Sequence, residues 1–199
     1  MKAQEGEQTR DDGFRDPYFG DSEDYHEEDY VEWTNSDHRQ NIHYLHGALH
    51  LHGALHLFHE GASLQKYCWK RTGVRILDQI DTALKKGLFP LIVAEGTSNQ
   101  KLEKIQRSNY LGHNYRSLGQ IGGSLFVYGH AMSENDRHIF EQVRKNTKLT
   151  QLFVGVFEAS STPSSKALIT TALSLATGRP RNKPLAVEFY DAKSARVWE

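Results

Sequence analysis

Residues 45–57 alternate between two kinds of side chain with a period of two. Every odd position in this stretch is Leu or Gly, and every even position is His or Ala. Successive side chains of a β-strand point to opposite faces, so the pattern predicts a strand with one buried face. The string LHGALH occurs twice, at 45–50 and at 51–56. Because six is an even number, the second copy keeps each residue on the face of its counterpart.

Short apolar runs alternate with helical spacing along the rest of the chain. The runs predict buried strands over residues 89–96, 124–128 and 151–157 and a last strand over 184–190. Helical spacing predicts helices over 74–86, 134–145 and 166–176, and helical segments over 99–120 that break near Asn109 or Gly112. Apolar strands that alternate with helices are typical of βαβ units. We therefore expect an α/β fold with a partial doubly wound, mostly parallel sheet flanked by helices.

The first 40 residues differ from the rest of the chain in charge and in aliphatic content. Residues 1–37 contain 13 Asp or Glu and three Lys or Arg, whereas the remaining residues contain 12 acidic and 21 basic side chains. This composition predicts a largely irregular, acidic segment over residues 1–40 and an α/β domain over 41–199. The basic excess of the domain suits a phosphate-bearing ligand, and an acidic segment that only solvates the protein is the alternative.

Composition also limits the class of protein. The sequence contains no apolar run of about eighteen residues, which a transmembrane helix requires. Its first residues lack the hydrophobic region of a secretory signal. The single cysteine, Cys68, rules out an internal disulfide and suits a reducing compartment. We therefore expect a cytoplasmic protein without a membrane partner, and no pattern indicates a specific nucleic-acid partner.

Three predicted strand ends carry residues suited to ligand binding. Ligands of open parallel sheets bind beyond the carboxyl ends of the strands. Glycine at such an end allows close approach of the backbone, and hydroxyl groups there are suited to a phosphate or a ribose. The candidate residues are His46 or its copy His52, then Gly96, Thr97 and Ser98, and then the segment from Gly129 through Ser133 to Asp136.

Ser133 and Asp136 allow two interpretations. Their spacing is that of the N-cap and N3 positions of a capping box, although the usual residue at N3 is Glu or Gln. Alternatively, Asp136 belongs to a ligand site. An acidic side chain at this place opposes a phosphate group but fits the hydroxyl groups of a ribose, as in dinucleotide-binding folds.

The histidines do not predict a metal site. Seven of the eleven lie between His38 and His59, and the duplicated string explains this density. No Cys, Asp or Glu between Asn41 and Phe58 completes a typical ligand set, so we expect no metal ion. The sequence also lacks the Gly-x-Ser-x-Gly elbow that presents many catalytic serines.

Two blocks of sequence resemble the sirtuin-like superfamily. Residues 42–50 resemble its Leu-His-Gly strand end, and residues 125–136 resemble a later block of bacterial sirtuin-like defence and NAD-hydrolysing domains. More narrowly, three strings are similar to an uncharacterised bacterial family catalogued as domain of unknown function 4917, over about residues 13–199. These strings are PLIVAEGTSNQKLEKI, YGHAMSENDRHI and KPLAVEFYDAKSARVW.

The sirtuin-like resemblance implies NAD as cofactor and cleavage of its nicotinamide–ribose bond. It assigns catalysis to His46 or His52, and binding to Gly96, Thr97, Ser98, Gly129, Ser133 and Asp136. A complete member would also have a Gly-rich phosphate loop and an Asn-x-Asp segment. This chain shows no such loop, and its one Asn-x-Asp string, at 35–37, lies in the polar acidic segment with no predicted strand before it. We therefore expect the chain to correspond to the C-terminal part of such a protein. It would be inactive alone unless a missing N-terminal half or a protein partner completes it. A non-catalytic interaction or regulatory module, or a truncated fragment, is the alternative.

Overall fold

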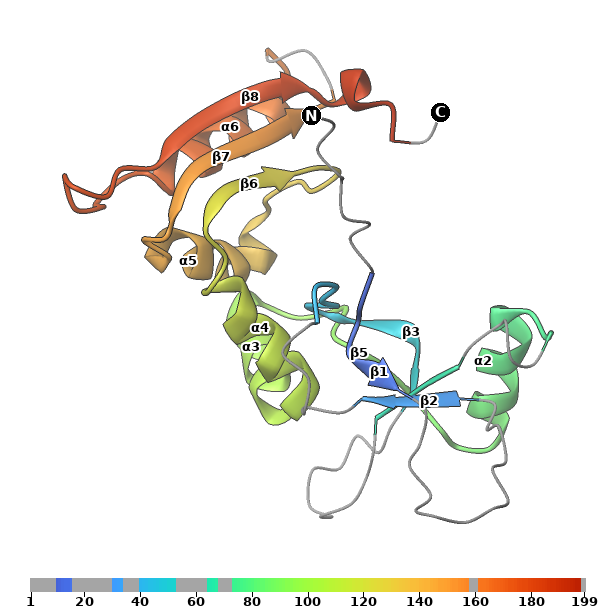
Figure 1. Ribbon diagram of the computed structural model, residues 1–199. Coiled ribbons are helices and arrows are strands. Elements are labelled where there is room, and N and C mark those ends of the chain that lie inside the picture. The colour runs from blue at the N-terminus through green and yellow to red at the C-terminus, as the bar shows by residue number, and fades with distance from the viewer. Residues whose placement is uncertain are drawn as a thin grey trace, which may run out of the picture. The chain divides into compact units, whose positions relative to one another are not determined.

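The computed structural model describes residues 10–15, 30–33, 40–52, 64–67, 73–157 and 161–197. The chain forms two compact units, shown as ribbons in Figure 1. The first unit comprises Met1–Ala94 with Arg107–Leu111, and the second comprises Glu95–Gln106 with Gly112–Glu199. Among the described helices, none has the length and apolarity needed to span a bilayer.

The first unit contains an antiparallel sheet of five strands. Its strand order is β1-β2-β4-β3-β5, and each neighbouring pair is antiparallel. The strands are β1 (Phe14–Arg15), β2 (Tyr30–Trp33), β3 (Gly47–His52), β4 (Gln65–Tyr67) and β5 (Pro90–Ile92). The prediction of one mostly parallel sheet is therefore wrong for β3 and β5. The apolar runs marked both strands, but periodicity within one strand does not reveal the direction of its neighbours.

Two further predictions for the first unit need correction. The run over 89–96 forms only the short strand β5, whose position at the edge of the sheet leaves Phe89 and Ile92 exposed. Strands β1 and β2 lie within the segment predicted to be largely irregular. Most of residues 1–40 lie outside the described residues, so the domain boundary at residue 40 stays a prediction.

Helix α2 (Ile76–Lys85) confirms the helix predicted over 74–86, and Gly87 follows it with φ 75°. Its buried residues are Gln79 and Ala83, whereas Leu77 is 72 % exposed. Gln79 is held in the interior because its side-chain amide donates a hydrogen bond to the backbone carbonyl of Val74. The apolar residues at helical spacing include Val74, Leu77 and Leu84, which are all exposed, so the helix turns a different face to the interior than this spacing predicts.

The second unit contains a parallel sheet of three strands, in the order β6-β7-β8. Helices α5 and α6 connect successive strands, which confirms the predicted βαβ arrangement for this part of the chain. The elements are α3 (Ser98–Arg107), α4 (Asn109–Leu118), β6 (Gly123–Val127), α5 (Arg137–Lys145), β7 (Leu149–Val156), α6 (Pro163–Ser174) and β8 (Ala186–Asp191). Two short 3-10 helices complete them, η1 (Glu134–Asp136) and η2 (Ala192–Ala195).

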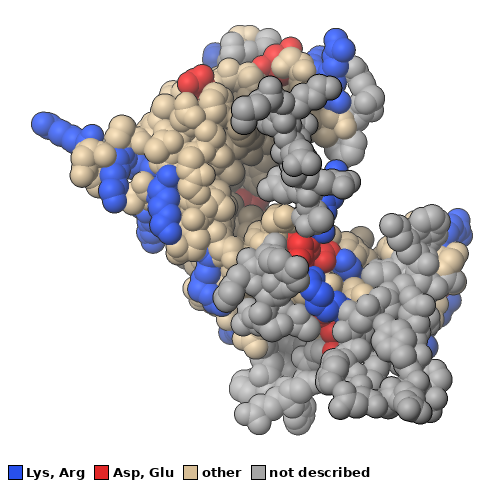
Figure 2. All heavy atoms as spheres, in the orientation of Figure 1, with Lys and Arg blue, Asp and Glu red and all other residues tan. Residues whose placement is uncertain are grey.

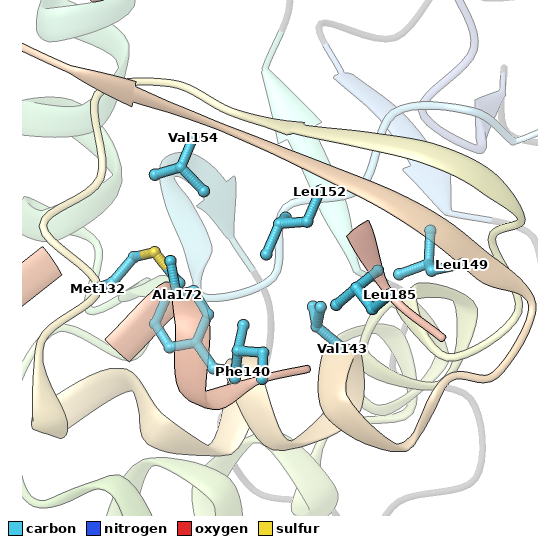
Figure 3. Close-up of a cluster of buried hydrophobic side chains, with 9 residues drawn as sticks. Met132, Phe140, Val143, Leu149, Leu152, Val154, Ala172 and Leu185 are labelled. Carbon is cyan, nitrogen blue, oxygen red and sulfur yellow. The ribbon is translucent and has the colours of Figure 1, made fainter. Parts of the chain in front are cut away.

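The core of this unit lies on one face of the sheet, between β7 and the two connecting helices (Figure 3). Right-handed crossovers between sequential parallel strands place both helices on the same face. Side chains from α5, β7 and α6 interlock there, and Leu152 and Val154 are fully buried. The cluster consists of Met132, Phe140, Val143, Leu149, Leu152, Val154, Ala172, Leu175 and Leu185.

The other face of the sheet is open in the described part of the chain. Phe126 of β6 is 64 % exposed, and its ring stacks on Phe153 of β7 at a centroid distance of 4.6 Å. In Figure 2 the surface over these strands is mostly tan, so it carries few charged side chains. The prediction over 124–128 is therefore confirmed as a strand and wrong in its burial, because only Leu125 and Val127 pack against the core, whereas Phe126 lies on the open face.

Candidate functional site

The loop that follows β6 is the centre of the candidate site. Gly129 begins it with φ 68°, and Met132 also has a positive φ, of 52°. The backbone N–H of Met132 donates a hydrogen bond to Nδ1 of His130 at 2.8 Å. The His130 ring lies edge-on against Phe140, with 5.2 Å between the ring centroids. One imidazole ring and the core beneath it thus support the shape of this loop.

Asp136 does not cap the helix that it precedes. Neither Ser133 nor Asp136 makes a side-chain capping bond, so the capping-box interpretation is wrong. Instead, Oδ1 of Asp136 lies 2.8 Å from Nζ of Lys101, and Oδ2 lies 3.5 Å from Nε2 of His130. The Asp136 and Lys101 side chains are only 16 % and 9 % exposed. The Lys101 ammonium therefore balances the carboxylate in a largely buried place.

Ser98 takes over the capping of α5 from outside that helix. The N–H of His138, in the first turn of α5, donates to Oγ of Ser98 at 2.8 Å, and Nδ1 of His138 pairs with the same oxygen at 3.0 Å. Because Ser98 satisfies this helix-end N–H, the Asp136 side chain is available to Lys101. One Asp136 oxygen also lies within 4.8 Å of a ring nitrogen of His138.

Tyr115 supports this arrangement from α4. Its hydroxyl donates to the carbonyl oxygen of His138 at 3.0 Å. Burial raises the pKa of Tyr115, and the nearby Glu141 carboxylate raises it further. The phenol therefore stays a neutral donor at physiological pH.

Thr97 and Gln100 fix the start of α3. The N–H of Thr97 donates to Oε1 of Gln100 at 2.9 Å, and the N–H of Gln100 approaches Oγ1 of Thr97 at 3.4 Å. These reciprocal bonds form a capping box, and Gly96 precedes it with φ 114°. The Thr-x-x-Gln spacing in the sequence is the local signal for this start of α3.

The structure brings together some of the predicted site residues. Ser98 and Asp136 belong to one group in the second unit, which we call the Asp136 cluster: Ser98, Lys101, His130, Asp136 and His138. Gly96, Thr97, Gly129 and Ser133 are exposed and flank this cluster in sequence.

Sequence reasoning did not select Lys101 or His138, and it gave His130 no role although this residue lies within the candidate segment 129–136. The only available signal was that each lies within four residues of a selected position, which is too weak to identify a partner.

The two predicted catalytic histidines belong to the first unit. His46 lies in the turn before β3, so its placement at the carboxyl end of a strand is wrong. The close approach of two strands explains the His-Gly pair differently. Gly47 pairs with Ile92, and a Cβ at Gly47 would lie 1.9 Å from the carbonyl oxygen of Leu91. His52 ends β3.

Several sequence interpretations concern residues that the structure does not describe. The side chain of His52, most of the second LHGALH copy and Cys68 lie outside the described residues. The same holds for several histidines of the 38–59 stretch, so the expectation of no metal ion stays a prediction.

Fold and geometry together define a mixed α/β protein with a polar cluster that follows a strand of a small parallel sheet. The chain belongs to the family described as "Domain of unknown function (DUF4917)", which it matches over residues 1–198. No curated protein and no solved structure matches the chain. The uncharacterised family expected from the sequence strings is thereby confirmed, and the sirtuin-like relationship stays a prediction.

Proposed function

We propose that the second unit binds a ribonucleotide, with the Asp136 carboxylate accepting hydrogen bonds from ribose hydroxyl groups. The observation that carries this proposal is the position of Asp136. It follows the carboxyl end of a parallel strand and pairs with Lys101 instead of capping its own helix. Ligands of parallel sheets bind beyond such strand ends, and an acidic residue near them contacts the ribose in dinucleotide-binding folds. A carboxylate has about four lone-pair positions and accepts several donors at once.

The start of α3 is the proposed place for the phosphate group. Helix N-termini attract anions through their backbone N–H groups and the helix dipole. Ser98, the first residue of α3, contacts the first turn of α5, so the α3 terminus lies beside the Asp136 cluster. Gly96 and Thr97 precede this terminus, and Gly129 and Ser133 belong to the loop after β6. These exposed residues are the proposed contacts for the rest of the nucleotide.

The sirtuin-like resemblance adds NAD as the nucleotide to test first. It also makes His46 or His52 the proposed catalytic base for cleavage of the nicotinamide–ribose bond, as in an NAD glycohydrolase. Positioning supplies much of catalysis, and the sequence contains no Gly-rich phosphate loop. Its Asn-x-Asp string at 35–37 follows β2, so the expectation that no strand precedes it is wrong, but the string itself lies outside the described residues. We therefore propose binding as the function of this chain and do not expect turnover from it alone.

Calorimetric titration and thermal melting test the binding of the ribose directly. The ligands are NAD, ADP-ribose, AMP and 2′,3′-dideoxy-AMP, which differs from AMP only in its ribose hydroxyl groups. We expect AMP to bind about tenfold more tightly than the dideoxy compound, because a hydrogen bond to a charged acceptor is lost. Asp136→Asn keeps the shape of the side chain and should remove this difference. Glu134→Gln removes the same charge from an exposed residue of η1 and should retain it.

Two results would contradict the proposal. One is equal affinity for AMP and the dideoxy compound, and the other is an equal effect of the two substitutions. A cooperative melt that no nucleotide shifts would favour the alternative, a non-catalytic interaction module.

A further inference from the structure

The loop between β6 and α5 contains a strained residue in the protein core. Met132 has φ 52°, a left-handed conformation that residues other than Gly, Asn and Asp rarely adopt. It is only 2 % exposed and packs in the cluster with Phe140. Its N–H donates to Nδ1 of His130, two residues earlier, at 2.8 Å. This bond closes the turn and helps to hold Met132 in its unusual conformation.

The same ring faces a carboxylate with its other nitrogen. Because Nδ1 accepts the Met132 N–H, the hydrogen of a neutral His130 ring lies on Nε2. Nε2 is 3.5 Å from Oδ2 of Asp136, longer than a normal hydrogen bond. Asp136 of η1 is the charged group that faces the ring. Its carboxylate also pairs with Lys101 of α3, and one of its oxygens lies within 4.8 Å of a ring nitrogen of His138 of α5.

Protonation of the ring changes both interactions in opposite directions. The added proton occupies Nδ1, which then has no lone pair to accept the Met132 N–H. The ring becomes a cation beside the Asp136 carboxylate, and this attraction strengthens. The neutral ring therefore stabilises the turn at Met132, whereas the charged ring stabilises contact with Asp136.

We propose that His130 is a pH-sensitive switch for the loop from Gly129 to Asp136. The neutral ring holds the turn, and the protonated ring releases it and binds Asp136. Its consequence for the ligand rests on the proposed function: nucleotide affinity falls as His130 is protonated, because the cation competes with ribose hydroxyl groups for the carboxylate. The turn itself opens whether or not a nucleotide binds.

Amide hydrogen exchange, followed by NMR, measures the turn without any ligand. The quantity is the protection factor of the Met132 amide, compared at about pH 8 and about pH 5.5, the interval in which histidines change charge. We expect it to fall by about tenfold at the lower pH in the wild type, since a buried N–H loses its partner. His130→Asn keeps an oxygen acceptor for an N–H two residues on and does not titrate. In this variant the protection should stay constant, whereas the control His113→Asn should behave like the wild type.

A second measurement on the wild type needs no variant. The ¹⁵N chemical shifts of the imidazole ring should show the Nε2–H form of His130 at the higher pH and the cation at the lower pH. An Nδ1–H form at the higher pH would overturn the proposal, and so would constant protection of Met132 in the wild type. Equal pH dependence in His130→Asn and the wild type would also overturn it.

Calorimetric titration with AMP at both pH values then separates the two proposals. If AMP binds at neither pH, the proposed function fails, and the exchange data still decide whether His130 acts as a switch. If AMP binds, its affinity should fall at the lower pH in the wild type and not in His130→Asn. An equal fall in both proteins would refute the link between the switch and the ligand.

Discussion

Replacing Gly47 by Ala tests the explanation of the His-Gly pair by close strand approach. Gly47 begins β3, pairs with Ile92 of β5 and has φ 76°. A Cβ there would lie 1.9 Å from the carbonyl oxygen of Leu91, a backbone atom. Real Cβ atoms essentially never come closer than 3.0 Å to such an atom, so the two strands must separate by about 3.0 − 1.9 = 1.1 Å.

Two terms make up the expected loss of stability. A left-handed conformation costs a residue with a Cβ about 1–2 kcal/mol. Separation of the strands also weakens the adjacent hydrogen bond from the N–H of Val93 to the carbonyl oxygen of His46, which is 2.8 Å long. One or two such bonds contribute about 1 kcal/mol each. We therefore expect Gly47→Ala to lower the free energy of unfolding by about 3 kcal/mol.

Gly87→Ala is the matched control in the same unit. Gly87 has φ 75°, and no heavy atom lies within 4 Å of a Cβ built there. Gly87→Ala should therefore lower the free energy of unfolding only by the cost of the left-handed conformation, about 1–2 kcal/mol. Urea unfolding followed by circular dichroism measures both losses, and exchange of the Val93 amide reports the local opening of β3 from β5. Equal losses for the two variants, or unchanged protection of Val93 in Gly47→Ala, would refute the close-approach explanation.

Three further predictions concern single side chains. Arg179 donates to two backbone carbonyl oxygens, at 2.9 and 2.7 Å, so Arg179→Met should lower the urea midpoint by the equivalent of about 2–3 kcal/mol; an unchanged midpoint would contradict this. Ser98→Ala leaves the N–H of His138 without its cap and should lower the stability measured by thermal melting by about 0.5–2 kcal/mol; an unchanged melting temperature would contradict this. Burial, and then the Lys66 ammonium, lower the pKa of His50. The unfolded chain therefore protonates His50 more readily than the folded protein does. The contribution of neutral His50 to the free energy of unfolding is fully present above about pH 6.5 and is lost as the pH drops below that value. His50→Gln should flatten the fall, and an equally steep fall would assign it to other groups.

The helices and their ends were largely predictable from the sequence. Apolar spacing located α2, α5 and α6, and the break between α3 and α4 lies at Ser108, close to the predicted Asn109. Helical hydrogen bonds join residues four apart, so a short window of sequence contains most of the information about a helix. The same holds for β6, β7 and β8, because helices of ordinary length between apolar strands imply parallel neighbours.

Burial and sheet membership were not predictable in the same way. The apolar runs over 89–96 and 124–128 look alike in the sequence. One became an antiparallel edge strand and the other a parallel edge strand, both with exposed aromatic or aliphatic side chains. Which strand lies at an edge depends on residues far away in the chain, and a single run does not contain that information.

The sequence by itself therefore predicted the helices and the strands β3 and β5 to β8, but not β1 and β2, and it made residues near Ser98 and Asp136 candidates for a site. Only the tertiary structure decided what those residues contact. Ser98 and His138 are 40 residues apart, and Lys101 and Asp136 are 35 residues apart. A spacing rule covers a few residues along one element, whereas these contacts join the starts of two different helices. Their pairing follows from the packing of α3 beside α5, which no local pattern expresses.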